Sequence, residues 1–116
     1  MKMIPKTKID AENQLFYAYN TASRAAVTVV MSIREAANSE AFDGSDASVA
    51  AISETEYGKS DAGKAALAEL KTKIQAAIIA GMRMGKADFK SELPNLVKRE
   101  VVQKKNEEKR KNKEAK

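Results

Sequence analysis

Cysteine and histidine do not occur anywhere in this chain, and each absence excludes a class of function. Without cysteine the protein forms no disulfide, offers no thiolate nucleophile and builds no zinc site on sulfur ligands. Without histidine it lacks the side chain that most often serves as a general base near neutral pH. Catalysis would rest on carboxylates or lysine, and no pattern of these residues indicates an active site. We therefore expect a protein that is not an enzyme and that holds no metal ion and no cofactor.

Aromatic residues and long hydrophobic runs are also scarce. Phe, Tyr and Trp make up 5% of the 116 residues, and tryptophan is absent, so the core must be aliphatic and rich in alanine. The longest nearly apolar run covers residues 25–33 and is far shorter than a membrane span. No apolar segment of the secretory type follows the lysines near residue 1. We expect an intracellular, cytoplasmic protein with no membrane partner, located in the host cytoplasm if the chain is viral.

Helical periodicity dominates what is present. Only two prolines occur, and apolar residues recur at spacings of three and four. No stretch alternates apolar and polar residues as a half-buried strand would. The predicted fold class is all-α: a small antiparallel helical bundle with two long helices, one short helix and a projecting basic C-terminal helix.

The boundaries of the first three helices follow from capping and breaking residues. The first long helix is expected to begin near residue 8 or 10 and to end near residue 38. A short helix is expected over residues 46–57, ended by Gly58 in a left-handed conformation. Ser60 is expected to cap the second long helix, which then runs to about residue 86 or 89.

The last helix and the core complete the predicted fold. Ser91 is expected to cap the last helix, with Pro94 in its first turn. Phe42, in the loop after the first helix, is expected to fold back onto the core. A seam of Ala77, Gly81 and Gly85 should let two helices approach closely. The predicted core consists of Leu15, Phe16, Tyr19, Ala22, Ala26, Val30, Ile33, Ile52, Leu67, Leu70, Ile74, Ile78, Phe89, Leu96 and Val97.

Charge is distributed unevenly along the chain. Residues 35–61 carry seven acidic residues and one lysine, whereas residues 95–116 carry nine Lys/Arg and four Asp/Glu. The first 94 residues sum to zero, so the whole net charge of +5 lies in residues 95–116. We therefore divide the chain into a helical bundle domain, residues 1–102, and a charged basic C-terminal extension, residues 103–116. Such a local excess of positive charge indicates an electrostatic binding surface.

The first functional hypothesis is a nucleic-acid-associated protein whose basic arm contacts the phosphate backbone, within a larger nucleoprotein assembly or alone. Binding would be salt-sensitive and independent of sequence, to DNA or RNA. No aromatic residue interrupts the basic segment, so it offers no base stacking. The acidic residues mixed into it should weaken its field. The predicted nucleic-acid-binding residues are Lys98, Arg99, Lys104, Lys105, Lys109, Arg110, Lys111 and Lys113.

Two further hypotheses stay open. One is a protein-binding inhibitor or adaptor, such as a viral-type regulator of a host machine, which acts through the acidic middle segment or a face of the bundle. The other is a structural homo-oligomer or scaffolding protein, with a homodimer as its simplest form. The residues predicted for a protein interface are Glu40, Asp43, Asp46, Glu54, Glu56 and Tyr57.

Overall fold

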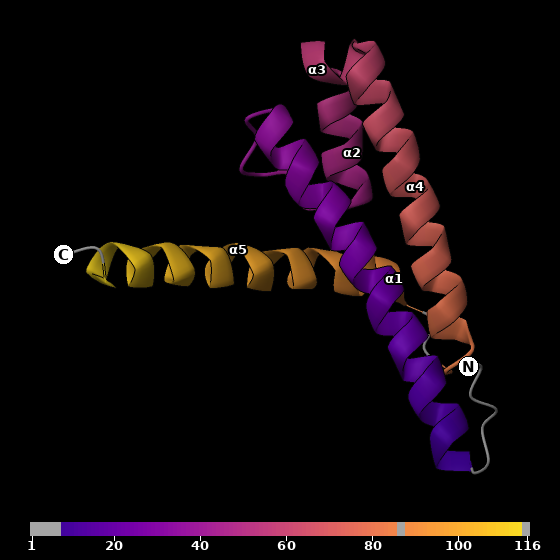
Figure 1. The fold of residues 1–116 in the computed structure, drawn as a ribbon. Helices are drawn as coiled ribbons and strands as arrows, with labels where there is room; N and C mark the ends of the chain where they lie inside the picture. The colour runs from indigo at the N-terminus through magenta and orange to yellow at the C-terminus, as the bar shows by residue number, and fades with distance from the viewer. Residues whose placement is uncertain (1–7, 86–87, 115–116) are drawn as a thin grey trace.

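The computed structural model describes residues 8–85 and 88–114, and within these ranges every regular element is a helix (Figure 1). The all-α prediction is therefore confirmed. The helices are α1 (Lys8–Ala36), α2 (Asp46–Ser53), α3 (Glu56–Lys59), α4 (Asp61–Met82) and α5 (Phe89–Glu114).

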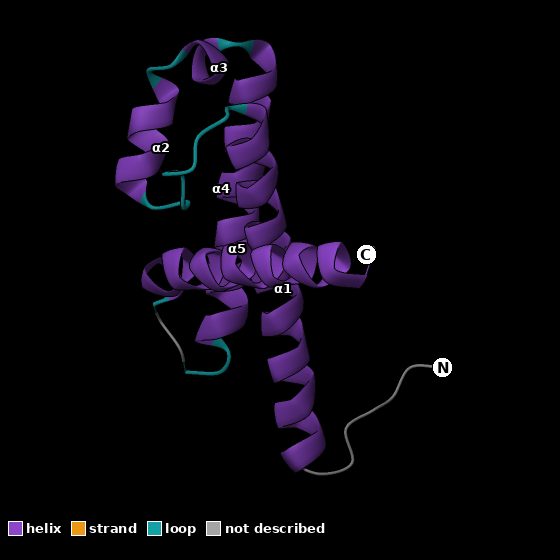
Figure 2. Ribbon diagram, turned by 90° about the vertical axis from the view of Figure 1, so that its left-hand side faces the viewer, coloured by secondary structure: helices purple, strands orange, loops and turns teal. Residues whose placement is uncertain are grey.

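Helices α1 and α4 form the largest contact between elements of the structure. Figure 1 shows them side by side, with α1 ascending and α4 descending. The first half of α5 packs against both helices, and Figures 1 and 2 show α5 lying across them. Helices α2 and α3 cover the end of the pair at which α4 begins.

The core lies where α1, α4 and the first half of α5 meet. Its largest fully buried side chains are Phe42, Ile33, Leu70, Leu93, Val30 and Val97. The predicted return of Phe42 to the core is confirmed, since this residue is 1% exposed. Leu93 is just as well buried, although the predicted core did not include it. Most of the predicted core residues are buried or pack against this cluster.

The prediction that Phe16 belongs to the core is wrong, since its side chain is 51% exposed. Phe16 lies one turn before Tyr19 and so continues the inward stripe of α1. In Figure 1, however, the first turns of α1 extend beyond the end of α4. Helical periodicity identified the correct face of α1, but the end of α4 decides how much of that face is covered.

The predicted short helix over residues 46–57 is two helices. The first of them, α2, ends at Ser53. Thr55 then caps α3 by accepting a hydrogen bond from the Gly58 N–H at 3.1 Å. Gly58 therefore lies inside α3. The prediction that it ends a helix in a left-handed conformation is wrong. The Ser60 cap of α4 is confirmed, because its hydroxyl oxygen accepts the Gly63 N–H at 3.0 Å.

The junction between α4 and α5 differs from the prediction. Helix α4 ends at Met82, and Gly85 follows with φ of +77°, so this glycine ends a turn instead of extending the seam with Ala77. Helix α5 begins at Phe89, so Ser91 is a first-turn residue whose hydroxyl donates to the Asp88 carboxylate at 2.9 Å. Phe89 is buried as part of the helix, so α5 begins two residues before the predicted Ser91 cap.

Candidate nucleic-acid interface

The first half of α5 is fixed firmly to the rest of the protein. Phe89, Leu93 and Val97 are each at most 2% exposed, and the Phe89 ring meets the Tyr19 ring edge to face with centroids 6.1 Å apart. Aromatic pairs of this geometry contribute about 0.5–1.5 kcal/mol beyond the area that they bury. These contacts fix the direction in which the second half of α5 leaves the bundle.

A buried hydroxyl reinforces this attachment. The Tyr19 O–H donates to a carboxylate oxygen of Glu92 at 2.6 Å, which ties α1 directly to α5. Burial, the hydrogen bond to Glu92 and the negative charge of Glu92 together raise the pKa of Tyr19 from 10.0 to about 12. The hydroxyl therefore stays protonated, and remains a donor, throughout the physiological pH range.

The second half of α5 leaves the body and is surrounded by solvent. Val101 is half-buried, whereas every described side chain from Val102 to Lys111 is exposed. Residues 102–114 extend for about 20 Å at the rise of an α-helix. Figure 1 shows this part of α5 reaching past the other helices. We call residues 102–114 of α5 the arm.

The predicted nucleic-acid-binding residues all fall on α5. Lys113 is in the helix, but its side chain lies outside the part of the chain that the structure describes. The side chains of the other seven are exposed. Their charges are therefore free to meet a partner, although they do not all point to the same side of the helix.

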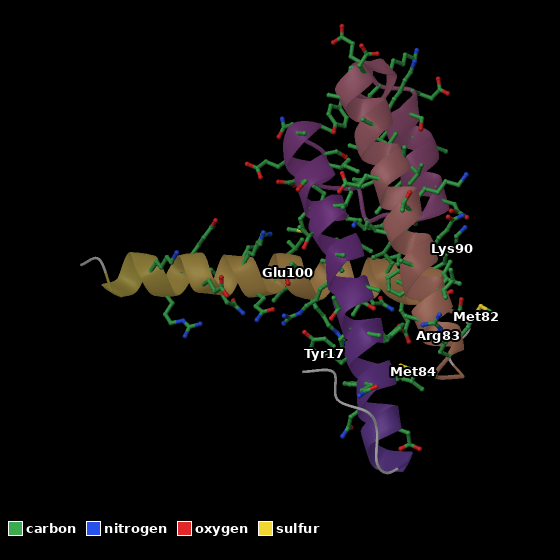
Figure 3. The ribbon with its side chains drawn as sticks, turned by 45° about the vertical axis from the view of Figure 1, so that its right-hand side comes forward. Tyr17, Met82, Arg83, Met84, Lys90 and Glu100 are labelled. Carbon is green, nitrogen blue, oxygen red and sulfur yellow. The ribbon has the colours of Figure 1, made fainter. Side chains whose placement is uncertain are left out.

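An open groove of about 1390 Å³ runs between α1 and α5. Its α1 wall includes the exposed Tyr17, which is 74% accessible, and Arg24. Figure 3 shows Tyr17 and Glu100 on the same side of α1, where α5 leaves the bundle. The α5 wall consists of Leu96, Arg99, Glu100, Gln103, Lys104, Glu107 and Glu108.

The acidic side chains of the second half of α5 gather on the groove side, beside Arg99 and Lys104, and the sequence interpretation missed this arrangement. All the acidic side chains that the structure describes between residues 95 and 111 line the groove: Glu100, Glu107 and Glu108. Among the described basic residues of α5, neither Lys98 nor Lys105 nor Lys109 lines it. The helical register of residues 98–109 could have revealed this arrangement. The net charge of the segment does not show which charges share a side of the helix.

The acidic residues predicted for a protein interface occupy three places. Glu40 and Asp43 belong to the loop after α1, Asp46 begins α2, and Glu54 and Glu56 lie near its other end. Asp46 pairs with Lys90 at 3.4 Å, but both side chains are mostly exposed, so the pair stabilises the fold little.

Two members of that predicted interface have local structural contacts. Burial alone would raise the pKa of Asp43, but hydrogen bonds from Ser45 and Ser48 outweigh it and lower that pKa below its usual value. The Ser45 backbone N–H donates to this carboxylate at 2.9 Å. Tyr57 is half-buried and packs against the core cluster.

Within the described residues, no three acidic side chains gather in a way that would hold a metal ion. None of the described helices combines the length and the apolar character needed to cross a membrane. Compared with protein-family models, curated proteins and solved structures, the chain shows no significant match to any of them.

Proposed function

We propose that this protein is a non-enzymatic, nucleic-acid-associated protein of the cytoplasm, in which a helical bundle presents a basic helix to the phosphate backbone. The observation that carries this proposal is the charge split. Residues 95–116 have a net charge of +5, whereas the first 94 residues sum to zero. Positive charge confined to an exposed element is the electrostatic signature of phosphate binding.

The geometry supports this role in two ways. The described side chains of the arm are exposed to solvent, so its lysines are accessible to a ligand. Its base is held by buried Phe89, Leu93 and Val97 and by the Tyr19–Glu92 hydrogen bond. A ligand on the arm would thereby be placed in a defined position relative to the body, as assembly into a larger nucleoprotein complex requires.

The test compares the full-length protein with a variant that ends at residue 102. Binding to labelled duplex DNA, single-stranded DNA and RNA is measured across a salt series. We expect the full-length protein to bind with an affinity that falls as salt rises, with a slope of about −0.9 per phosphate contact on duplex DNA. The variant retains Phe89 to Val101 and should keep its helical circular dichroism while losing the binding.

Equal affinity of the two proteins would contradict the proposal, and so would an affinity that does not change with salt. Because the variant keeps the buried half of α5, a difference in binding cannot be attributed to loss of the core. If the variant loses binding, residues 1–102 act as a positioning domain and residues 103–116 as a binding extension.

A second candidate function is a protein-binding inhibitor or adaptor, and the α1–α5 groove favours it. The groove lining mixes basic residues such as Arg24 and Arg99 with acidic residues such as Glu35 and Glu100. It also includes Tyr17, whose ring is exposed. A mixed lining suits a peptide or helix better than a polyanion. Recovery of one stoichiometric protein partner, unaffected by nuclease and lost on Tyr17→Ser substitution, would favour this alternative.

A further inference from the structure

We infer that nucleic acid is bound by one side of α5 only, formed by Lys98, Lys105 and Lys109, and that this side lies along a single phosphate backbone. We call these three residues the lysine stripe. The inference rests on the proposed function and adds to it the face of the helix and the mode of contact.

The register of the helix brings the three lysines together. Successive residues of an α-helix are turned by about 100°, so positions 98, 105 and 109 fall within about 40° of one another. All three side chains are exposed. Between them, about 40° from Lys98, lies the neutral Val102, which is 52% exposed. The stripe is therefore a line of three positive charges about 16 Å long.

Two of the three acidic residues lie on the opposite side of the helix. Glu100 and Glu107 lie about 160–180° from Lys98 around the helix, and Glu108 lies about 80° from it. All three line the groove toward α1, which the lysine stripe does not line within the described residues. The acidic residues of the segment therefore weaken the field of the groove side far more than that of the stripe.

This division of charge determines how a duplex would meet the helix. A helix inserted into the major groove faces phosphates on both of its flanks and base edges at its tip. In α5 the side opposite the lysine stripe carries Glu100 and Glu107, which would approach one of the two strands and be repelled. Contact along a single backbone avoids this repulsion and predicts binding that is independent of sequence.

The same surface fits a nucleic acid better than an anionic membrane. Interfacial helices bury a continuous apolar face among the lipid chains. The stripe offers Val102 as its one large apolar side chain, flanked by lysines and Asn106. Its chemistry is that of a row of point charges spaced along a line, which matches a row of phosphates.

The experiment uses two full-length variants with equal changes of net charge. Lys105→Gln/Lys109→Gln removes charge from the stripe, whereas Lys104→Gln/Lys111→Gln removes it from positions about 120–140° away from Lys98. Affinity for labelled duplex and single-stranded DNA and for RNA is measured by fluorescence anisotropy across a salt series. Circular dichroism checks that both variants keep the helix content of the wild type.

We expect the stripe variant to bind about tenfold more weakly, with a salt slope smaller by about two phosphate contacts. The control variant should bind within about twofold of wild type. Equal losses in the two variants would overturn the inference while leaving the proposed function standing. A wild type that binds no nucleic acid would overturn both, and so would binding restricted to phosphatidylserine vesicles, which are assayed in parallel.

Discussion

At the scale of single residues, the contact between Tyr19 and Glu92 joins positions 73 apart in the chain. Tyr19→Phe removes the donor and leaves a half-buried carboxylate without that hydrogen bond. We expect a loss of about 1–2 kcal/mol in the free energy of unfolding, measured by urea denaturation. Tyr17→Phe is the matched control, because Tyr17 is 74% exposed, and its stability should not change. Equal stabilities of the two variants would show that the contact does not hold α5.

The same pair gives a prediction about alkaline pH. The pKa of Tyr19 is about 12 in the folded protein and 10.0 for an ordinary tyrosine, so the fold favours the protonated hydroxyl. Its contribution is fully present below pH 10 and is lost as the pH rises from 10 through 12. We expect the stability advantage of wild type over Tyr19→Phe to vanish in that window. An advantage that grows above pH 10 would contradict the assignment.

Gly63 is required by the close approach of two turns at the start of α4. A Cβ at this position would lie 1.8 Å from the backbone oxygen of Tyr57, a clash that only a backbone shift relieves. We expect Gly63→Ala to reduce the free energy of unfolding by at least about 2 kcal/mol. Gly85→Asn is the control: position 85 has a left-handed φ, which asparagine tolerates, and nothing within 4 Å of a Cβ. Its loss should stay below about 1 kcal/mol.

At the scale of elements, the two halves of α5 should differ in stability although they form one continuous helix. The first half is packed through Phe89, Leu93 and Val97, whereas every described side chain beyond Val101 is exposed to solvent. Oppositely charged residues four positions apart, as at 107 and 111, would add only about 0.2–0.5 kcal/mol each. We expect amide hydrogens beyond residue 103 to exchange much faster than those of α1 and α4. Bound nucleic acid should slow that exchange, and an arm as protected as α4 in the free protein would contradict this prediction.

The elements themselves were largely predictable from the sequence, because the helices are set by local periodicity and by caps such as Ser60. One misassignment arose from a local cap and another where a tertiary contact decides. Thr55 provides a cap within a run of helix-forming residues and splits the short helix in two. Phe16 lies on the correct face of α1, but its side chain is left 51% exposed.

The candidate site was predictable in its location but not in its arrangement. The lysines of the arm stand out in the sequence, and all the predicted basic positions fall on α5. The separation of the lysine stripe from Glu100 and Glu107 depends on helical register, and the groove depends on how α5 crosses α1. Spacing along the chain is enough to separate the lysines from the glutamates around the helix. The groove, by contrast, forms only when distant segments pack together.

At the scale of the whole molecule, the projecting arm enlarges the protein. The radius of gyration is 16.9 Å, whereas a compact chain of 116 residues would have about 13 Å. We expect small-angle X-ray scattering to give a value near 17 Å for the full-length protein and a clearly smaller one after removal of residues 103–116. A full-length value near 13 Å would mean that the arm folds back onto the body.

The dependence of the core on Phe89, Leu93 and Val97 also has a consequence for biosynthesis. Helices α1 and α4 are made first, but their shared core stays open until the first half of α5 has left the ribosome and closed it. Chains halted before residue 89 would expose that surface and become substrates for chaperones and proteases. The lysine stripe follows these core residues directly, so it leaves the ribosome just as the body becomes able to fold. Nucleic acid would therefore meet the stripe almost exclusively on molecules whose core can already close.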